Sequence, residues 1–498
     1  MAHAEASSLL LELPNSCMLA VLQRCAADDQ RSVLSAARAH SRLHQAAVLV
    51  LHSITAVVNR QEQVDSVVLY LSNHGQHVRS VSLKRTEEAE YVKLRQLPPG
   101  LQLEQLQFEG MHLRLHPGNG CRGVLGAAAD IAALKQLRLY GCAFLTSVRY
   151  DGTTMVPPEE LAAALQQLPA GLEHLSLRTP SMVHQHLPTG VLQRLQQLSY
   201  LELVGFTLQA PGQGANALQP LEALTGLVDL RLSCQGRMLV AADMLSGTHH
   251  LTRLELRSCS VEPAVMAGKT RLQHLEIVSG HIRGASGVAQ LLSHLQPLQQ
   301  LTQLSLTNSV TGIEDNPAAA AAYSVLTTSS KLQHMDVSMC QLPAGVWQHI
   351  FPPGRQLPHL RQLDISHVRQ PPGDVAVAPE GSGLVSCCPG LQSLDLMSVR
   401  CGAKLLAPLQ GLSGLTELSI DPFSSAEEDC LNSVCQLTGL KKLYVGYSSM
   451  ASKEGLLLHL SQLQQLTSLS YCDPDTNRYC TLDSQVIRPL ALRCTTRS

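Results

Sequence analysis

Apolar residues recur along this chain in a six-residue pattern, L-x-x-L-x-L. Fourteen copies are close to this form, and a weaker one, VRSVSL, starts at Val78. The last three positions of each copy alternate apolar, polar and apolar, which is the period of a short strand with one buried face. The fourteen copies begin at Leu103, Leu134, Leu172, Leu198, Leu227, Leu251, Leu272, Leu301, Leu332, Leu360, Leu391, Leu415, Leu440 and Leu466.

The segments between these strands have the composition of short helices and turns. Residues 157–169, PPEELAAALQQLP, place proline and two glutamates where a helix begins. Pro317 follows Asp315 and Asn316 and opens an alanine run, which predicts another helix. Each unit is therefore expected to be a strand and a return segment, with neighbouring strands paired in parallel.

The pattern and its spacing resemble those of leucine-rich repeats. Most successive starts lie in or near the roughly 20–29 residues of that family. The resemblance implies an α/β leucine-rich-repeat solenoid, a horseshoe with a concave parallel β-sheet, preceded by a small all-α module. The expected boundaries are 9–55 for the helical module, 56–471 for the solenoid and 472–498 for a C-terminal cap or tail. Cys142, Cys259 and Cys340 stand eight residues after the first leucine, as in the cysteine-containing repeat type, and are expected to be buried structural residues.

The N-terminal segment has a different pattern. Residues from Leu11 to Leu51 predict three short helices, with apolar residues at helical spacing in the first and last. The segment resembles an F-box, although His40 stands where that family has tryptophan or phenylalanine. The matching positions include Leu13, Pro14, Leu19, Leu22, Asp28, Asp29, Arg42 and Leu43.

That resemblance implies that the module binds a Skp-type adaptor and, through it, a cullin complex. Leu13, Pro14, Leu19, Leu22 and Leu43 would form the adaptor contact or support it. A second interpretation stays open, in which the helices simply cap the solenoid, because an array of repeats needs a polar terminal unit.

Composition and charge narrow the classes of function. The net charge is −2 and only 3% of residues are aromatic, so nothing predicts binding to nucleic acid or to an acidic membrane. No apolar run reaches about 18 residues, so no membrane span is expected. The irregular spacing of 15 cysteines indicates free thiols, Cys387 and Cys388 among them. We therefore expect a cytoplasmic protein, with a nuclear or axonemal location as alternatives.

No recognised catalytic or cofactor-binding motif is found. The sequence lacks a Walker loop, a GxSxG elbow, an HExxH helix and paired CxxC motifs. His174, His274 and His334 take the same outward strand position in units that are not adjacent, so they are expected to be exposed and to share no metal. Catalytic residues, cofactors and metals are all expected to be absent, and the chain is not expected to be an enzyme.

One charge pattern does indicate a binding surface. The middle outward residue of each strand is acidic in five of the six units from Leu251 to Leu391, and no base occupies that place. Because strands lie about 4.8 Å apart, these carboxylates would form a column that binds a basic segment of a target protein. An alternative stays open, since aspartate is common at this position for structural reasons. The candidate residues are Glu255, Glu276, Asp336, Asp364 and Asp395, with Glu417 and Asp421 beside them.

Two functions compete. The first is a substrate receptor of a cullin-type ubiquitin ligase, with the helical module on the adaptor and the repeats on a target. The second is a non-degradative scaffold, such as a cytoskeletal or axonemal repeat protein. A third, an enzyme or an activator of a small GTPase, would need a positioned catalytic residue, and no loop arginine stands out.

Overall fold

The computed structural model contains two compact units, Met1–Gln235 and Gly236–Ser498. No helix found in its described residues is both long and apolar enough to cross a membrane. The structure describes residues 14–28, 41–86, 92–94, 96–114, 124–129, 131–145, 158–180, 185–209, 221–234, 238–282, 287–310, 317–370, 374–375, 378–401, 403–421, 427–446, 460, 462–473 and 478–483.

The first unit begins with two helices that share a small core. The helices α2 (Asn15–Asp28) and α4 (Ser41–Val50) follow the helical spacing of their apolar residues, as the sequence predicted. The middle predicted helix lies outside the described residues. The buried residues of this core are Met18, Leu22, Leu43, Ala46, Ala47, Val50 and Leu51.

The main sheet of the first unit is parallel, and its strands are the predicted repeats. One strand, β1, precedes the first L-x-x-L-x-L copy and was not predicted from the pattern. Along each strand the leucine positions are buried and the polar positions lie on the opposite face. In pairing order the strands are β1 (Ser53–Val58), β2 (Ser80–Arg85), β4 (Gln105–Glu109), β6 (Gln136–Tyr140), β8 (His174–Arg178), β10 (Tyr200–Val204) and β12 (Asp229–Ser233).

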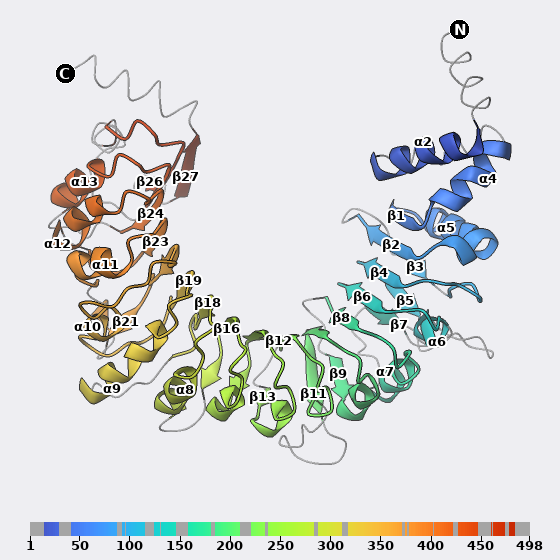
Figure 1. The fold of residues 1–498 in the computed structure, drawn as a ribbon, viewed down its shortest axis with the longest axis horizontal. Coiled ribbons are helices and arrows are strands. Elements are labelled where there is room, and N and C mark those ends of the chain that lie inside the picture. Colours follow the sequence, from blue (N-terminus) through green and yellow to red (C-terminus); the bar gives the residue numbers. More distant parts are fainter. Residues whose placement is uncertain are drawn as a thin grey trace, which may run out of the picture. The chain divides into compact units, whose positions relative to one another are not determined.

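The return segments of this unit cover the buried face of its sheet (Figure 1). They contain α5 (Gln61–His74), α6 (Val124–Ala129) and α7 (Pro158–Leu165), the last within the predicted 157–169 segment. Short strands form two further parallel ladders. These are β3 (Lys93–Leu94), β5 (His112–Arg114) and β7 (Ala143–Leu145), and separately β9 (Gln185–Pro188) and β11 (Phe206–Gln209).

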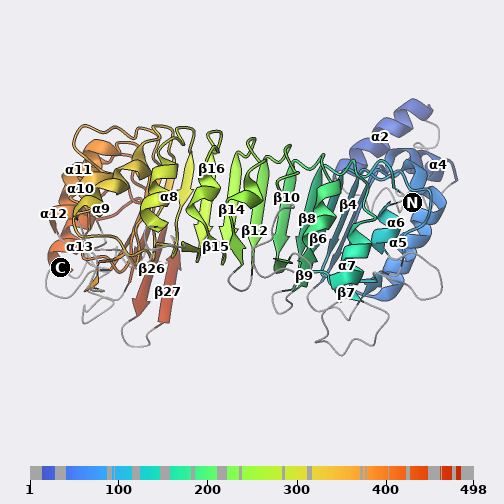
Figure 2. The same ribbon diagram turned by 90° about the horizontal axis from the view of Figure 1, so that it is seen from below.

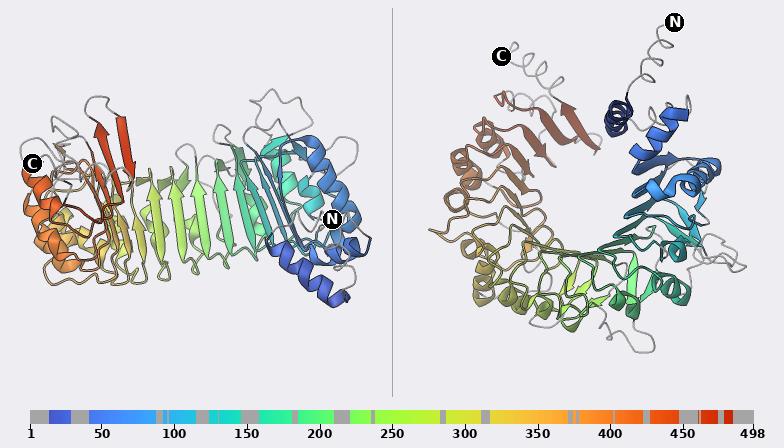
Figure 3. Two further views of the ribbon diagram at one scale, coloured as in Figure 1. Left: turned by 90° about the horizontal axis from the view of Figure 1, so that it is seen from above. Right: turned by 45° about the vertical axis from the view of Figure 1, so that its right-hand side comes forward.

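The second unit repeats the same plan with strands of three to six residues, seen side by side in Figure 2. All neighbouring pairs are parallel except the last, the β26–β27 hairpin, drawn in red in Figure 3. The order is β14 (Arg253–Arg257), β16 (His274–Val278), β18 (Gln303–Ser305), β19 (His334–Asp336), β20 (Gln362–Asp364), β23 (Ser393–Leu396), β24 (Glu417–Ile420), β25 (Lys442–Val445), β26 (Ser468–Asp473) and β27 (Arg478–Asp483).

The helices of the second unit lie behind this sheet (Figure 1). The alanine helix predicted after Asn316 is α9. The helices are α8 (Gly287–Leu295), α9 (Pro317–Ala322), α10 (Trp347–Ile350), α11 (Gly381–Cys387), α12 (Ala403–Leu406) and α13 (Glu427–Cys435). The short strands β13 (Leu239–Val240), β15 (Ser260–Val261) and β17 (His281–Ile282) add a parallel ladder, and β21 (Arg369–Gln370) pairs antiparallel with β22 (Asp374–Val375).

A turn with left-handed backbone follows successive strands of the second unit. The residue at this place has φ between 50° and 58°, and in several units its N–H donates to a carbonyl of the next repeat. Met339, for example, donates to the carbonyl of Ser366 at 2.8 Å. The residues with this conformation are Ser258, Ser279, Asn308, Met339, His367 and Ser398.

Buried cysteines close the same turns, as predicted. The Sγ of Cys142 donates to the carbonyl of Phe108 at 3.4 Å, and that of Cys340 donates to the carbonyl of Leu306 at 2.9 Å. Each carbonyl belongs to the preceding unit. The Ser309 hydroxyl makes the equivalent bond to Ile277 at 2.8 Å, so a short side chain with a donor serves the same purpose in this unit. Other units place a buried apolar residue there, such as Val368 and Val399. Burial raises the pKa of the Cys142 thiol to about 12 and that of Cys340 to about 11, which keeps both thiols protonated.

Candidate partner-binding face

The residues predicted to serve adaptor binding take different places in the helical module. Leu22 and Leu43 are buried in its core, and Leu19 packs partly against that core. Pro14 is exposed at the start of α2, while Leu13 and His40 lie outside the described residues. Val21, which was not singled out from the sequence, is an exposed apolar residue on the same helix, 39% accessible.

The strand face of the first unit carries a mixture of aromatic and basic residues. The His174 ring stacks on Tyr200 with centroids 3.8 Å apart. The guanidinium of Arg178 lies 4.9 Å from the centre of the Tyr140 ring, and that of Arg231 lies 5.2 Å from Tyr200. Such cation–π contacts hold long side chains flat against the sheet. The polar and aromatic side chains of this face are therefore largely paired with one another.

Glu202 is the buried centre of that face. Its carboxylate accepts hydrogen bonds from Ser176 at 2.5 Å and Arg178 at 2.6 Å. Burial alone would raise the pKa of Glu202, but the bonds from Arg178 and Ser176 outweigh it and the pKa is lowered. Burial, assisted by Arg138, lowers the pKa of His174 to about 4, so its imidazole is neutral near pH 7.

The acidic column predicted for the later repeats is present in register in the second unit. Glu255 is the cross-strand partner of Glu276, which is opposite Ser305. The column then continues across the next strands. Ser305 is the cross-strand partner of Asp336, Asp336 of Asp364, and Asp364 of Asp395. The sequence therefore placed these residues correctly on one face of one sheet.

No base occupies the middle strand position, yet bases at flanking positions neutralise the glutamates of this set. Arg253 forms an ion pair with Glu255, and Arg257 forms one with Glu276 at 2.5 Å. Lys442 lies 2.6 Å from Glu417. These bases flank the middle position, so considering only the middle residue of each strand missed them. The uncompensated charge is concentrated in the aspartates.

Asp336, Asp364 and Asp395 each have a structural role. Each Oδ1 accepts the N–H two residues later, at 2.8 Å from Ser338, 2.9 Å from Ser366 and 3.0 Å from Met397. The left-handed residue of the turn comes next. The structural alternative raised by the sequence is thus supported at these three positions, since each aspartate holds the turn that ends its strand.

The same three aspartates also keep a negative field on the strand face. None of them forms an ion pair with a base in the described part of the chain. Burial raises the pKa of Asp364 to about 6, against the hydrogen bonds from Ser366, and the neighbouring charges of Asp395 and Asp336 raise it further. Burial also raises the pKa of Asp395. These shifts are typical of carboxylates that lack a positive partner.

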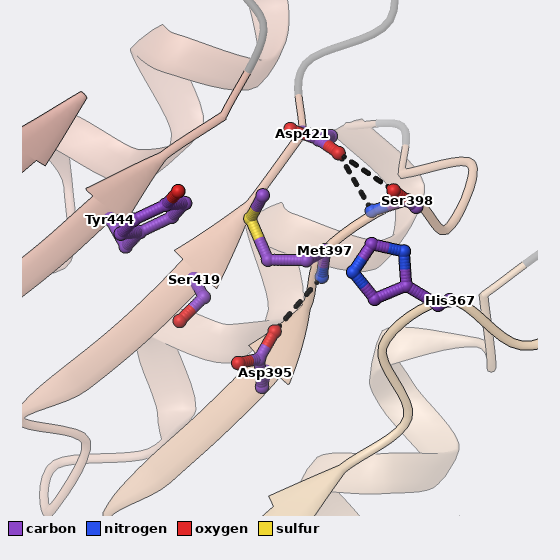
Figure 4. Close-up of a pocket in the computed structure, with 7 residues that line it drawn as sticks. All are labelled: His367, Asp395, Met397, Ser398, Ser419, Asp421 and Tyr444. Carbon is purple, nitrogen blue, oxygen red and sulfur yellow. Dashed lines mark hydrogen bonds between the residues drawn. The ribbon is translucent and has the colours of Figure 1, made fainter. Parts of the chain in front are cut away.

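Asp421 lies at a hollow beside Asp395 (Figure 4). The hollow has a volume of about 230 Å³, and His367, Met397 and Tyr444 also line it. Asp421 is 4% exposed, and its Oδ2 accepts bonds from the N–H and hydroxyl of Ser398 at 2.8 and 3.1 Å. A side chain on Gly446 would collide with Oδ1 of Asp421, so that glycine makes room for the carboxylate.

The histidines expected to be exposed are instead partly buried, so that expectation was wrong. His274 Nδ1 contacts the side-chain oxygen of Gln303, and His334 Nδ1 lies 2.7 Å from that of Gln362. Both glutamines belong to the next strand. A neighbouring strand contributes the contact that buries each ring, which a pattern within one repeat does not show. Cys387 and Cys388 are free and buried.

Comparisons with known proteins support the fold and nothing finer. No family model and no curated protein matches the sequence. Among solved structures, the chain is similar to a leucine-rich-repeat protein of Leptospira interrogans, with 15% identity, a TM-score of 0.53, and coverage of 86% of this chain and 92% of that one. An internalin of Listeria monocytogenes matches with 14% identity, a TM-score of 0.45, and coverage of 89% and 94%. The chain therefore has an α/β leucine-rich-repeat fold, as its sequence predicted.

Proposed function

We propose that this chain is a non-enzymatic protein-binding module that captures a basic segment of a partner on the strand face of its second unit. The observation that carries the proposal is the run of Asp336, Asp364 and Asp395 on three neighbouring strands, none of which forms an ion pair within the described residues. Lysine or arginine side chains of the partner would supply the missing positive charge. Asp421 is buried beside the adjoining hollow and adds negative charge beneath it.

The energetics favour an extended partner over a single charged group. An exposed ion pair contributes about 0.2–1 kcal/mol, so only several contacts together give useful affinity. The field of aligned carboxylates also speeds association, and salt weakens that effect. Because the aspartates already bond to their own turns, the face is held rigid before the partner arrives, which reduces the entropic cost of binding.

The test replaces Asp336, Asp364 and Asp395 together by asparagine and measures binding of a fluorescent arginine-rich peptide by anisotropy. We expect wild-type protein to bind and the triple variant to lose at least tenfold in affinity. The matched control exchanges three exposed glutamates of the first unit, Glu62, Glu159 and Glu222, for glutamine. That control has the same change in net charge, so equal weakening in both variants would show non-specific attraction and reject the proposal.

We further propose that the helical module docks a Skp-type adaptor, which would make the chain a substrate receptor of a cullin-type ubiquitin ligase. The support is the resemblance to an F-box together with the exposure of Pro14, just before α2, and of Val21 on α2. Leu22 and Leu43 would act from within the core, by holding α2 and α4 together. This part of the proposal does not depend on the aspartate face.

Affinity purification of the full chain from cells, scored for adaptor and cullin, tests the adaptor proposal. The informative variant is Val21→Asp, which changes the surface of α2. Leu69→Asp is the matched control, because Leu69 is an exposed apolar residue on α5, 64% accessible. We expect only Val21→Asp to lose the adaptor. Absence of adaptor from the wild-type complex would favour the non-degradative scaffold.

A further inference from the structure

Three potential metal ligands meet on the first two strands of the second unit's sheet. Glu255 comes from β14, and His274 and Glu276 come from β16. The Nε2 of His274 lies 3.7 Å from Glu255 Oε1 and 3.5 Å from Glu276 Oε2. One ligand atom from each residue lies within 4.8 Å of those of the other two, and Glu255 is buried while the others are partly buried.

The two ring nitrogens of His274 differ in their hydrogen bonding. Its Nδ1 contacts the side-chain oxygen of Gln303, which can only accept, so Nδ1 carries the hydrogen. In the neutral ring, Nε2 then presents a lone pair toward two carboxylates. Nε2 is buried and makes no hydrogen bond of ordinary geometry, although it lies 3.5 Å from Glu276 Oε2, close enough to lower the pKa of that carboxyl. Arg253 and Arg257 already pair with the two glutamates, and a proton or a metal ion between the three facing atoms would satisfy Nε2 as well.

We propose that Glu255, His274 and Glu276 bind a divalent transition-metal ion such as Zn²⁺. The two measured separations are close to the roughly 3.4 Å between ligand atoms in a tetrahedral site whose bonds are about 2.0–2.1 Å. Gln303 would hold the ring in the tautomer that coordinates through Nε2, as a second-shell partner commonly does. A water or a side chain of the partner protein would complete the coordination.

Two arginines oppose this binding and limit its strength. Arg253 bonds to Glu255, and Arg257 bonds to Glu276 Oε1, the oxygen that does not face His274. Both guanidinium groups reach in from partly exposed positions, so water screens part of their charge. Arg257 can stay on Glu276 Oε1 while the metal takes Oε2. Arg253 bonds through Nε and Nη2 to Glu255 Oε1, the oxygen that faces His274, so the metal must displace Arg253 from that oxygen or bind through Oε2. We therefore expect moderate affinity, which should increase when either arginine is removed.

The ligand types also predict which metal binds. One imidazole and two carboxylates suit zinc and other first-row divalent ions, whereas magnesium and calcium prefer sites made of oxygen alone. Zinc should therefore bind at submillimolar concentration and magnesium should not compete with it. The site lies three strands away from Asp364, so its occupation does not depend on the proposed aspartate contacts.

The experiment is a Zn²⁺ titration of the full chain by calorimetry after treatment with a chelator. The key variant is His274→Gln, and the matched control is His334→Gln. His334 takes the equivalent strand position and makes the same kind of contact, with Gln362, but among the described residues it belongs to no group of three potential metal ligands. We expect His274→Gln and Glu276→Gln to lose one equivalent of bound zinc, and His334→Gln to keep it. Arg257→Gln should tighten binding severalfold.

The opposite results would overturn the proposal. If wild type binds no zinc at submillimolar concentration, or if His274→Gln binds it as wild type does, a proton alone links His274 to the glutamates. Weaker zinc binding in a folded Arg257→Gln variant would also contradict the proposal. Arg257 is expected to compete with the metal for Glu276, so its removal should not weaken metal binding. Circular dichroism of each variant separates loss of metal from loss of fold.

Discussion

At the scale of single residues, the aspartates of the second unit serve the turn and the surface at once. Asp364 accepts the Ser366 N–H through Oδ1 and still carries a charge that its surroundings oppose. Asparagine has the same acceptor oxygen without the charge, and alanine has neither. Substitution at this position therefore separates two effects that are combined in the native side chain.

We expect Asp364→Asn to stabilise the protein at pH 7 and Asp364→Ala to be less stable than Asp364→Asn. Removing a carboxylate whose pKa lies about two units above its ordinary value should gain on the order of 1–3 kcal/mol. Loss of the turn hydrogen bond should cost Asp364→Ala about 1 kcal/mol relative to asparagine. Chemical denaturation of the three proteins measures both differences.

The pH dependence of this effect has a definite sign. Because the folded pKa of Asp364 is raised to about 6 from 3.8, the folded state binds the proton more tightly than the unfolded state. The free energy of unfolding should therefore fall as pH rises from about 4 to 6 and stay lower above that window. Asp364→Asn should match wild type near pH 4 and exceed it at pH 7. An asparagine variant less stable at both pH values would contradict this account.

At the scale of the repeat, stability comes from leucines stacked between adjacent strands. Leu304 of β18 is 2% exposed and is the cross-strand partner of Leu275 and Met335. We expect Leu304→Ala to cost about 2–5 kcal/mol, because it leaves a cavity between units that cannot collapse freely. Gln296→Ala, an exposed change at the end of the preceding repeat, should cost less than about 0.5 kcal/mol. Denaturation midpoints compare the two, and equal losses would show that the site repacks.

The sequence predicted the strands well because one leucine pattern encodes both strand and register. It missed β1 (SITAVV), which has strand-forming residues but no L-x-x-L-x-L. It placed the acidic column on one face but did not pair Arg257 with Glu276, because that contact joins different positions on adjacent strands. The ion-paired glutamates of the column could therefore be distinguished from its aspartates only in the structure, where the pairing of neighbouring strands is known.

At the scale of the whole molecule, the small net charge does not reflect the negative charge on the strand face of the second unit. The net charge is −2, yet three aspartates on adjacent strands of the second unit form no ion pair in the part of the chain that the structure describes. We expect affinity for a basic peptide to fall as salt rises, since the contacts are electrostatic. Affinity should also fall as pH drops through about 6, where Asp364 takes a proton. Anisotropy titrations over salt and pH measure both trends, and affinity independent of both would contradict the proposed binding mode.

The left-handed turns make the second unit a starting point for engineering. Six residues other than glycine hold this conformation at equivalent places, and each such residue costs on the order of 1 kcal/mol or more. Met339 is 51% exposed, so asparagine, which tolerates left-handed backbone, could replace it without emptying the core. Changes in separate repeats should add nearly independently. A second unit with a higher free energy of unfolding would then tolerate destabilising substitutions on its strand face, where new binding specificities would be selected.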